Sequence, residues 1–196
     1  MENITNEQTI EILGLASVPN ACFSQLLIDQ LKEGLCKGSV NAGAVANTIK
    51  AIQNNSLKKV RQFRGEVLKG FHYAHWIEAR NIAKNISNHW EMNSPQSTKL
   101  EDQIAKSLKE VGLKEGEQLT EKAVRQLAHD VVHQGYFERR RKGQETGEWI
   151  IFAKDNDKNI FLSLARHKED DLDIYSRMEK NCVEYPQLFQ KRGPQV

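Results

Sequence analysis

The sequence predicts an α+β fold: a helical N-terminal half, then a helical hairpin, a three-stranded antiparallel β-meander and a C-terminal helix. Three observations support this expectation. Apolar residues recur with helical spacing in several segments before residue 135. Short runs rich in β-branched and aromatic residues follow over residues 136–165. Acidic residues then open the last periodic segment, where a helix dipole favours negative charge.

The composition is that of an ordinary globular protein. The 196 residues are 39% hydrophobic and 28% charged, with a net charge of +2. No apolar run approaches 18 residues, and the N-terminus lacks the basic and apolar regions of a signal peptide. Three cysteines without a CxxC pair indicate neither a disulfide framework nor a thiolate zinc site. We therefore expect a soluble, cytoplasmic protein with no membrane partner and no cofactor.

Three helices are expected before residue 54. The first spans residues 5–18 behind a Thr5/Asn6 cap, and Pro19 ends it. Asn20 is expected to cap the second, whose apolar stripe runs to the glycines at 34 and 38. The third, richer in small residues, is expected near residues 41–53.

The following segment is basic and then aromatic. Lys58, Lys59, Arg61, Arg64 and Lys69 stand against one acid, and the sequence GFHYAHW follows at residues 70–76. A helix, a short strand or an irregular segment would each fit there. A helix over residues 76–90 then completes an all-helical region, residues 1–92, and the turn-forming residues of 93–98 form a linker.

An α+β domain is expected over residues 99–196. Thr98 and Glu101 form a capping-box signature for its first helix, and Thr120 opens a second helix that Gly135 ends. Strands are expected at 136–141, 148–154 and 159–165, with a helix at about 170–180. The turn between the last two strands places Trp149 opposite Leu164 and Ala153 opposite Ile160, which gives the sheet one apolar face.

Glu148 and His167 fall near each other on one sheet face in this register. A carboxylate and an imidazole are the minimum for general acid–base catalysis near neutral pH. If Arg139, Arg140 and Arg141 approach from the neighbouring strand, they and Arg166 could bind phosphate. This pattern predicts metal-independent RNA cleavage, with Glu148 as base and His167 as acid. The alternative interpretation is that both are ordinary polar residues at strand ends.

The order of helical hairpin, antiparallel meander, basic strand and Arg166-His167 is similar in outline to small bacterial toxin ribonucleases of the RelE and barnase sort. The resemblance covers about residues 98–180 and depends on element order, not on a shared motif. It implies an endoribonuclease that needs no metal ion.

A winged-helix DNA-binding protein is the second hypothesis. The segment from Ala123 through the basic run resembles a recognition helix followed by a wing, and Arg125 and Gln126 would then contact base edges. The basic run fits a solvated edge strand equally well, because cations discourage edge-to-edge pairing.

Two histidine pairs suggest further alternatives. His129 and His133 flank Asp130 in an HDxxH pattern typical of a metal-dependent hydrolase, although no third ligand is suitably spaced, so a solvated helix face is the simpler interpretation. His72 and His75 lie among three aromatics, which fits a stacking platform for single-stranded nucleic acid or an ordinary core. The last hypothesis is a non-enzymatic interaction protein with a protein partner. Among partners, nucleic acid is expected, with RNA favoured over DNA.

Overall fold

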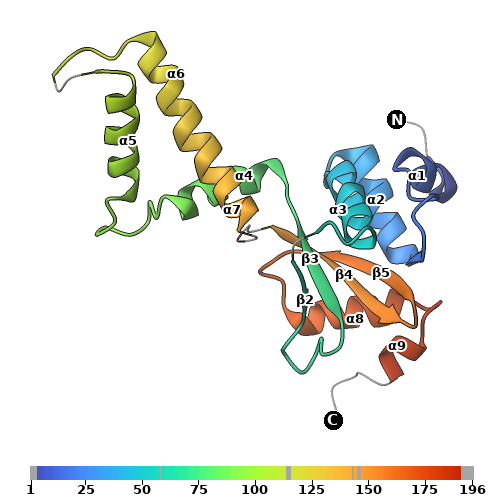
Figure 1. Cartoon of the computed structure of the whole chain (residues 1–196). Helices are drawn as coiled ribbons and strands as arrows, with labels where there is room; N and C mark the ends of the chain where they lie inside the picture. Colours follow the sequence, from blue (N-terminus) through green and yellow to red (C-terminus); the bar gives the residue numbers. More distant parts are fainter. Residues whose placement is uncertain (1–3, 58, 114–115, 143, 145–146, 191–196) are drawn as a thin grey trace. The chain divides into compact units, whose positions relative to one another are not determined.

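A computed structural model describes residues 4–57, 59–113, 116–142, 144 and 147–190 (Figure 1). Lys58 of the basic segment therefore lies outside the described residues. Contacts divide the chain into two compact units, which we call the sheet unit (residues 1–78 and 147–196) and the helical unit (residues 79–146). The linker expected at 93–98 lies inside the helical unit. Among the described helices, none is long and apolar enough to cross a membrane.

The sheet unit contains a mixed sheet in which the described strands have the order β1-β5-β4-β3-β2. Strand β1 (Ala21–Phe23) is parallel to β5 (Lys158–Ala165), whereas β4 (Glu148–Asp155), β3 (His72–Trp76) and β2 (Val60–Gln62) follow in antiparallel order. The expectation of a purely helical region before residue 92 is therefore wrong. The first three strands are three to five residues long, too short for a periodic signal, and non-local pairing stabilises them.

Each of the three helices near the N-terminus begins at a residue whose side chain caps it. Helix α1 (Asn6–Ile12) begins behind a complete capping box at Thr5. Helix α2 (Gln25–Lys37) is capped by Ser24 and α3 (Ala42–Gln53) by Asn41, each through a side-chain oxygen. Asn20 is not a cap: its φ is 54° and its carbonyl accepts from the Asn159 backbone, so it begins the pairing of β1 with β5.

Both faces of the sheet are buried. One face packs against α1, α2 and α3, and the other packs against α8 (Asp171–Asn181) and α9 (Gln187–Gln190) (Figure 1). Strands β4 and β5 supply both cores, because neighbouring residues of a strand point to opposite faces. The first core takes Ile150, Phe152, Phe161 and Leu164; the second takes Ile151, Ala153, Ile160, Leu162 and Ala165.

The hairpin of β4 and β5 has the expected register over only half its length. Ala153 pairs with Ile160 as predicted, but a bulge after Ile151 shifts the rest, so Trp149 pairs with Ala165 instead of Leu164. Leu162 is the extra residue of β5 at this bulge. The expected single apolar face is wrong, because Ile150, Phe152 and Phe161 form a core on the other face. The extra residue also turns Leu164 toward that core.

The helical unit consists of α4 (Ala79–His89), α5 (Lys99–Glu110), α6 (Glu121–His129), a π-helix η1 (Asp130–Gln134) and α7 (Gly135–Arg141). The strand expected at 136–141 is wrong, because helix continues through Gly135. A Cβ at Gly135 would stand 2.6 Å from Nε1 of Trp90, so the glycine allows close packing instead of ending the helix. Trp90 Nε1 donates to the Val131 carbonyl over 2.8 Å within η1.

One helix start differs from its sequence signature. Thr98 precedes α5, but its side chain makes no capping bond to the backbone. Its hydroxyl donates instead to the Asp102 carboxylate over 2.9 Å. At Thr120, by contrast, the hydroxyl accepts from the Ala123 backbone over 3.2 Å, as the cap prediction requires.

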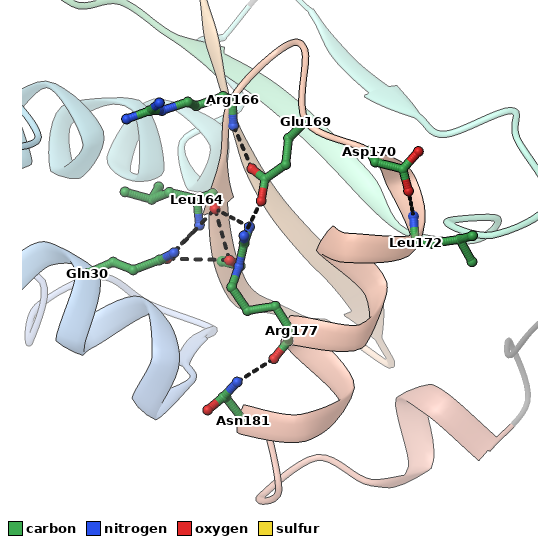
Figure 2. Close-up of polar contacts among 9 residues, drawn as sticks. Gln30, Leu164, Arg166, Glu169, Asp170, Leu172, Arg177 and Asn181 are labelled. Atoms are coloured by element: carbon green, nitrogen blue, oxygen red, sulfur yellow. Dashed lines mark hydrogen bonds and ion pairs between the residues drawn. The ribbon is translucent and has the colours of Figure 1, made fainter.

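The outer edge of β5 continues beyond β1, and side chains satisfy its backbone there. The Gln30 amide reaches from α2, accepting from the Leu164 N–H over 2.7 Å and donating to the Leu164 carbonyl over 3.3 Å. Figure 2 shows this pair together with Arg177 of α8, whose Nη2 donates to the same carbonyl over 3.1 Å. Gln30 thus supplies the hydrogen bonds of a missing strand residue.

We predict that Gln30→Leu lowers the free energy of unfolding by about 1–3 kcal/mol, because it leaves the Leu164 N–H without its acceptor. Urea denaturation followed by circular dichroism measures this change. Gln25→Leu is the matched control on α2: the Gln25 side chain bonds Asp29 at the exposed surface, and its loss should change stability by less than about 0.5 kcal/mol. Equal effects of the two variants would refute the strand-like role of Gln30.

Candidate nucleic-acid interface

A hollow of about 840 Å³ opens on the sheet unit beside β2, β3 and β4. Three cations, Lys59, Arg61 and Arg64, line it together with three rings, Phe63, Tyr73 and Trp149, and with Gln62 and Asp171. We call it the basic hollow. The cations are exposed, whereas Tyr73 and Trp149 are half-buried. The hollow therefore combines charged groups at its rim with apolar ring surface.

Strand geometry places these groups together. Lys59, Arg61 and Phe63 alternate along β2 and its extensions, so they share a face. Arg61 pairs with Tyr73 of β3, and Tyr73 pairs in turn with Ile151 of β4. The basic segment and the aromatic segment, separate in the sequence, thus form adjacent rows of one sheet face.

The rings of the basic hollow belong to a larger set of five that pairwise ring contacts connect, which we call the ring cluster: Phe63, Tyr73, His75, Trp149 and His167. Tyr73 and Trp149 have centroids 5.2 Å apart, and each lies within 5.3 Å of Phe63. Trp149 contacts the His167 ring at 5.0 Å, and His167 stacks on His75 at 5.9 Å with an interplanar angle of 16°. Aromatic surface therefore continues from the hollow to His167.

His75 is held neutral inside this cluster. Trp149 Nε1 lies 3.1 Å from His75 Nε2. Because an indole N–H can only donate, Nε2 must accept, and the proton of the neutral ring is on Nδ1. Burial and, to a smaller extent, the positive charges of His167, Arg61 and Lys59 together lower the pKa of His75 to about 4. At neutral pH the ring is uncharged.

Glu148 and His167 are neighbours, as the sequence predicted, but their contact runs through the backbone. The His167 N–H donates to Glu148 Oε2 over 2.8 Å. The exposed His167 ring lies instead against Trp149 and His75. A carboxylate and an imidazole thus occupy adjoining positions at one end of the ring cluster.

The loop that carries His167 is fixed by a second carboxylate. Glu169 Oε2 accepts from the Arg166 N–H over 3.1 Å, and Oε1 pairs with Arg177 of α8 (Figure 2). Arg177 also bonds the end of β5, so strand, loop and helix are joined. Arg166 follows β5 directly and is exposed, next to His167.

The three arginines expected beside this pair on a neighbouring strand lie on a helix. Arg139, Arg140 and Arg141 belong to α7 in the helical unit, so the strand that was to bring them to Glu148 does not exist. Successive helix positions are 100° apart, so the three do not form one row. Arg139 Nε donates to Asn85 over 3.3 Å, and Arg141 pairs with Glu138 at 2.9 Å.

The HDxxH pattern combines two exposed histidines with a buried aspartate. His129 and His133 stack at 4.4 Å and share a face, as expected. Asp130 is 4% exposed, and it accepts from Ser107 Oγ at 2.7 Å and Gln126 Nε2 at 2.9 Å. The Ser107 bond lowers the pKa of Asp130 most, which fits a structural carboxylate joining α5 to η1. The described residues contain no group of three or more acidic, histidine or cysteine side chains positioned to hold a metal ion.

The expected base-reading residues of a winged helix already have partners within their helix. Arg125 pairs with Glu121 at 2.5 Å, and Gln126 donates to Asp130. The segment that was to supply the first wing strand is α7. The resemblance to toxin ribonucleases depended on a basic strand in the same segment. Because that segment is α7, the element order differs from the one expected.

Comparison with protein-family models, with curated proteins and with solved structures found no match to this chain.

Sequence reasoning found part of this site. It identified Glu148, His167, the basic segment and the aromatic segment as separate features. It missed Trp149, assigned to an apolar core face, and Asp171, assigned to a helix cap. Only the pairing of β3 with β4 brings them together, and the spacing of the segments gives no signal of that pairing.

Stability should depend on the protonation of His75. Between pH 6.5 and about 4 the unfolded chain binds the proton and the folded chain does not, so the free energy of unfolding should fall as pH falls through this window. Allowing for partial exposure, we expect a loss of about 1–3 kcal/mol. Below pH 4 this contribution no longer changes.

The measurement is urea denaturation across this pH range. His75→Gln retains an acceptor for Trp149 but does not titrate, so its pH dependence should be flatter than that of the wild type. His133→Gln, at an exposed position of η1, should retain the wild-type slope. An unchanged slope in His75→Gln would show that His75 titrates normally in the folded protein.

Proposed function

We propose that this chain binds single-stranded nucleic acid, with RNA favoured, in the basic hollow. One observation carries the proposal: three cations and three rings line the same hollow. Cations neutralise the phosphates of the strand, and ring faces stack on its bases. A cytoplasmic location is part of the proposal, because RNA is encountered there.

The geometry favours a single strand over a duplex. The bases of a duplex stack on one another, whereas an unpaired strand can place its bases on Tyr73 and Trp149. Strand β2 ends the described strand order, and its three residues are exposed. A strand lying along β2 would therefore meet Lys59 and Arg61 with its phosphates while its bases reach the rings.

The structure gives less support to the other three hypotheses drawn from the sequence. A winged-helix DNA-binding function would need a wing next to α6, but α7 follows instead. A metal hydrolase would need at least three ligands around the metal ion, and the described residues contain no such group. Asp130 lies 3.4 Å from His129 Nδ1, but it is buried and accepts from Ser107. A non-enzymatic protein-binding role would not require the cations and the rings to contact one ligand together. Weaker RNA binding in both the charge variant and the ring variant described below would therefore count against that role.

RNA cleavage is the finer form of the proposal. It requires a proton acceptor and a proton donor beside the binding surface, and Glu148 and His167 adjoin the hollow through Trp149.

The charges lining the hollow should have opposite effects on affinity. Arg61→Gln should weaken binding of a single-stranded RNA about three- to tenfold and reduce the salt slope by about 0.7, because one phosphate contact is lost. Asp171→Asn should strengthen binding about two- to fivefold, because it removes the acid of the hollow. Fluorescence anisotropy over a range of salt concentrations measures both changes.

The control for these variants is Arg125→Gln, which removes a cation from the helical unit. It should leave affinity within about twofold of wild type. If Arg61→Gln and Asp171→Asn changed affinity in the same direction, the hollow would not be the binding site.

Stacking should contribute as much as charge. Tyr73→Leu should weaken RNA binding about tenfold with an unchanged salt slope, because stacking on one base contributes about 1–3 kcal/mol and involves no phosphate. Phe137→Leu, an exposed ring of α7, is the matched control and should bind like wild type. Thermal unfolding of both variants checks that the fold is intact. Normal affinity in a folded Tyr73→Leu protein would exclude stacking on this ring.

A further inference from the structure

We infer that the basic hollow prefers strands that contain guanine, because Asp171 accepts hydrogen bonds from the Watson–Crick edge of that base. This preference depends on the proposed binding function and adds the choice of base to it. Its basis is a half-buried carboxylate that has no partner among the described residues and that lies in a hollow lined by cations and rings.

Asp171 differs from the acids next to it in the chain, because each of those has a structural role. Asp170 caps α8 by accepting from the Leu172 N–H over 2.9 Å, and Glu169 pairs with Arg177 (Figure 2). Asp171 forms no hydrogen bond or ion pair with any residue that the structure describes, although three cations line the same hollow. Its carboxylate is therefore available to a ligand.

Burial makes this unpaired carboxylate unfavourable in the free protein. Burial, together with the negative charge of Asp170, raises the pKa of Asp171. A cation close to the carboxylate would lower the pKa instead, so the cations of the hollow do not compensate the lost hydration. A ligand that donates hydrogen bonds to Asp171 would supply this compensation.

The helix dipole alone does not explain where Asp171 lies. Asp173 belongs to the same first turn of α8 and is exposed, so it can interact favourably with the dipole and remain hydrated. Asp171 is half-buried in the wall of the hollow. A role in binding accounts for this difference.

Gly65, in the connection between β2 and β3, leaves space beside the carboxylate. A Cβ at this position would stand 3.3 Å from Asp171 Oδ2, which is closer than an ordinary van der Waals contact. Any residue with a side chain would therefore crowd the oxygen that we assign to the ligand, whereas glycine does not.

Guanine is the base whose edge suits an ionised carboxylate, which can only accept hydrogen bonds. Its N1–H and its 2-amino group are adjacent donors, so the two carboxylate oxygens can accept from both, as they do from a guanidinium group. Adenine and cytosine place one donor beside an acceptor, and uracil places one donor between two acceptors. Each of these three bases would thus direct a lone pair at the carboxylate.

The other groups of the hollow suit the rest of the same base. Guanine O6 and N7 are acceptors, and arginine donates to both in the commonest base-specific contact. Arg61 and Arg64 line the hollow, and the rings beside them offer a stacking surface. The volume of about 840 Å³ lies within the range of small-molecule sites, so a nucleotide fits. Acceptor, donors and ring surface for guanine therefore lie in one hollow.

The test compares the affinity of the full chain for three RNA strands that differ at one base. Each is a short oligouridine whose central position holds guanosine, inosine or uridine. Inosine keeps the N1–H and O6 of guanosine and lacks only the 2-amino group. We expect the guanosine strand to bind about tenfold more tightly than the inosine strand, and the uridine strand to bind most weakly. Fluorescence anisotropy at one salt concentration measures the three affinities.

Two variants of α8 identify the group that selects the base. Asp171→Asn should bind the guanosine and inosine strands within about twofold of each other, because an amide has one accepting oxygen and its amino group faces a donor. Asp173→Asn removes the same charge from the same helical turn but does not line the hollow, so it should keep the wild-type preference. Thermal unfolding of both variants checks that the fold is intact.

A ratio of affinities separates base selection from charge. The phosphates are common to the three strands, so their attraction to the hollow cancels in the ratio. The uridine strand reports the charge effect alone, and there Asp171→Asn should strengthen binding as predicted above.

The outcomes distinguish this inference from the binding proposal. Equal affinity of the wild type for the three strands overturns the guanine preference and leaves the binding proposal standing. Absence of binding to all three strands overturns both. A guanosine preference that persists unchanged in Asp171→Asn assigns base selection to other groups and also overturns the inference.

Discussion

The sheet unit depends on the burial of β4 and β5 on both faces. Residues Ile150 to Ala153 are fully buried, and residues Ile160 to Ala165 are all buried, so each face needs its own cover. The helices α1 to α3 cover one face, and α8 and α9 cover β5 on the other. Toward β2, rings and cations replace helix, and α8 contributes Asp171 to the hollow there. The candidate site is thus the part of the second face where aromatic side chains, and not a helix, shield the sheet.

Local signals predicted much of the fold. The caps at Thr5 and Thr120, the hairpin of β4 and β5 and the acidic start of α8 each depend on residues within a few positions of one another. The predictions were wrong where contacts with residues distant in the sequence determine the local structure. Strand β3 exists because β4 pairs with it, and Gly135 lies within a helix because Trp90 needs the space that a side chain would fill. The bulge after Ile151 likewise has no turn residue to mark it.

In the candidate site, too, the local predictions were right and those that depended on distant contacts were not. Glu148 and His167 were predicted to adjoin because a hairpin joins them, and a one-residue register shift does not separate them. The arginines at 139–141 were expected on a strand, but that segment is α7 of the helical unit, so the expected strand is wrong. His75 meets Trp149 across 74 residues of chain, with the whole helical unit between them. Such a contact follows from sheet topology, which spacing within one sequence does not encode.

The cations on and beside β2 could serve to protect an edge strand or to bind a ligand, and the neighbouring rings distinguish these two explanations. An exposed edge strand benefits from Lys59 and Arg61 because cations discourage pairing with another strand. That role requires no aromatic neighbour, since water solvates the charges well enough. Here the same cations line a hollow with the buried Phe63 and with Tyr73 and Trp149, which are half-buried. The exposed part of these two rings remains in contact with water unless a ligand covers it. Burial raises the pKa of Asp171 in that hollow, so water is already partly excluded there. Edge protection thus accounts for the charges, but a ligand with flat apolar groups and negative charge accounts for the charges and the rings together.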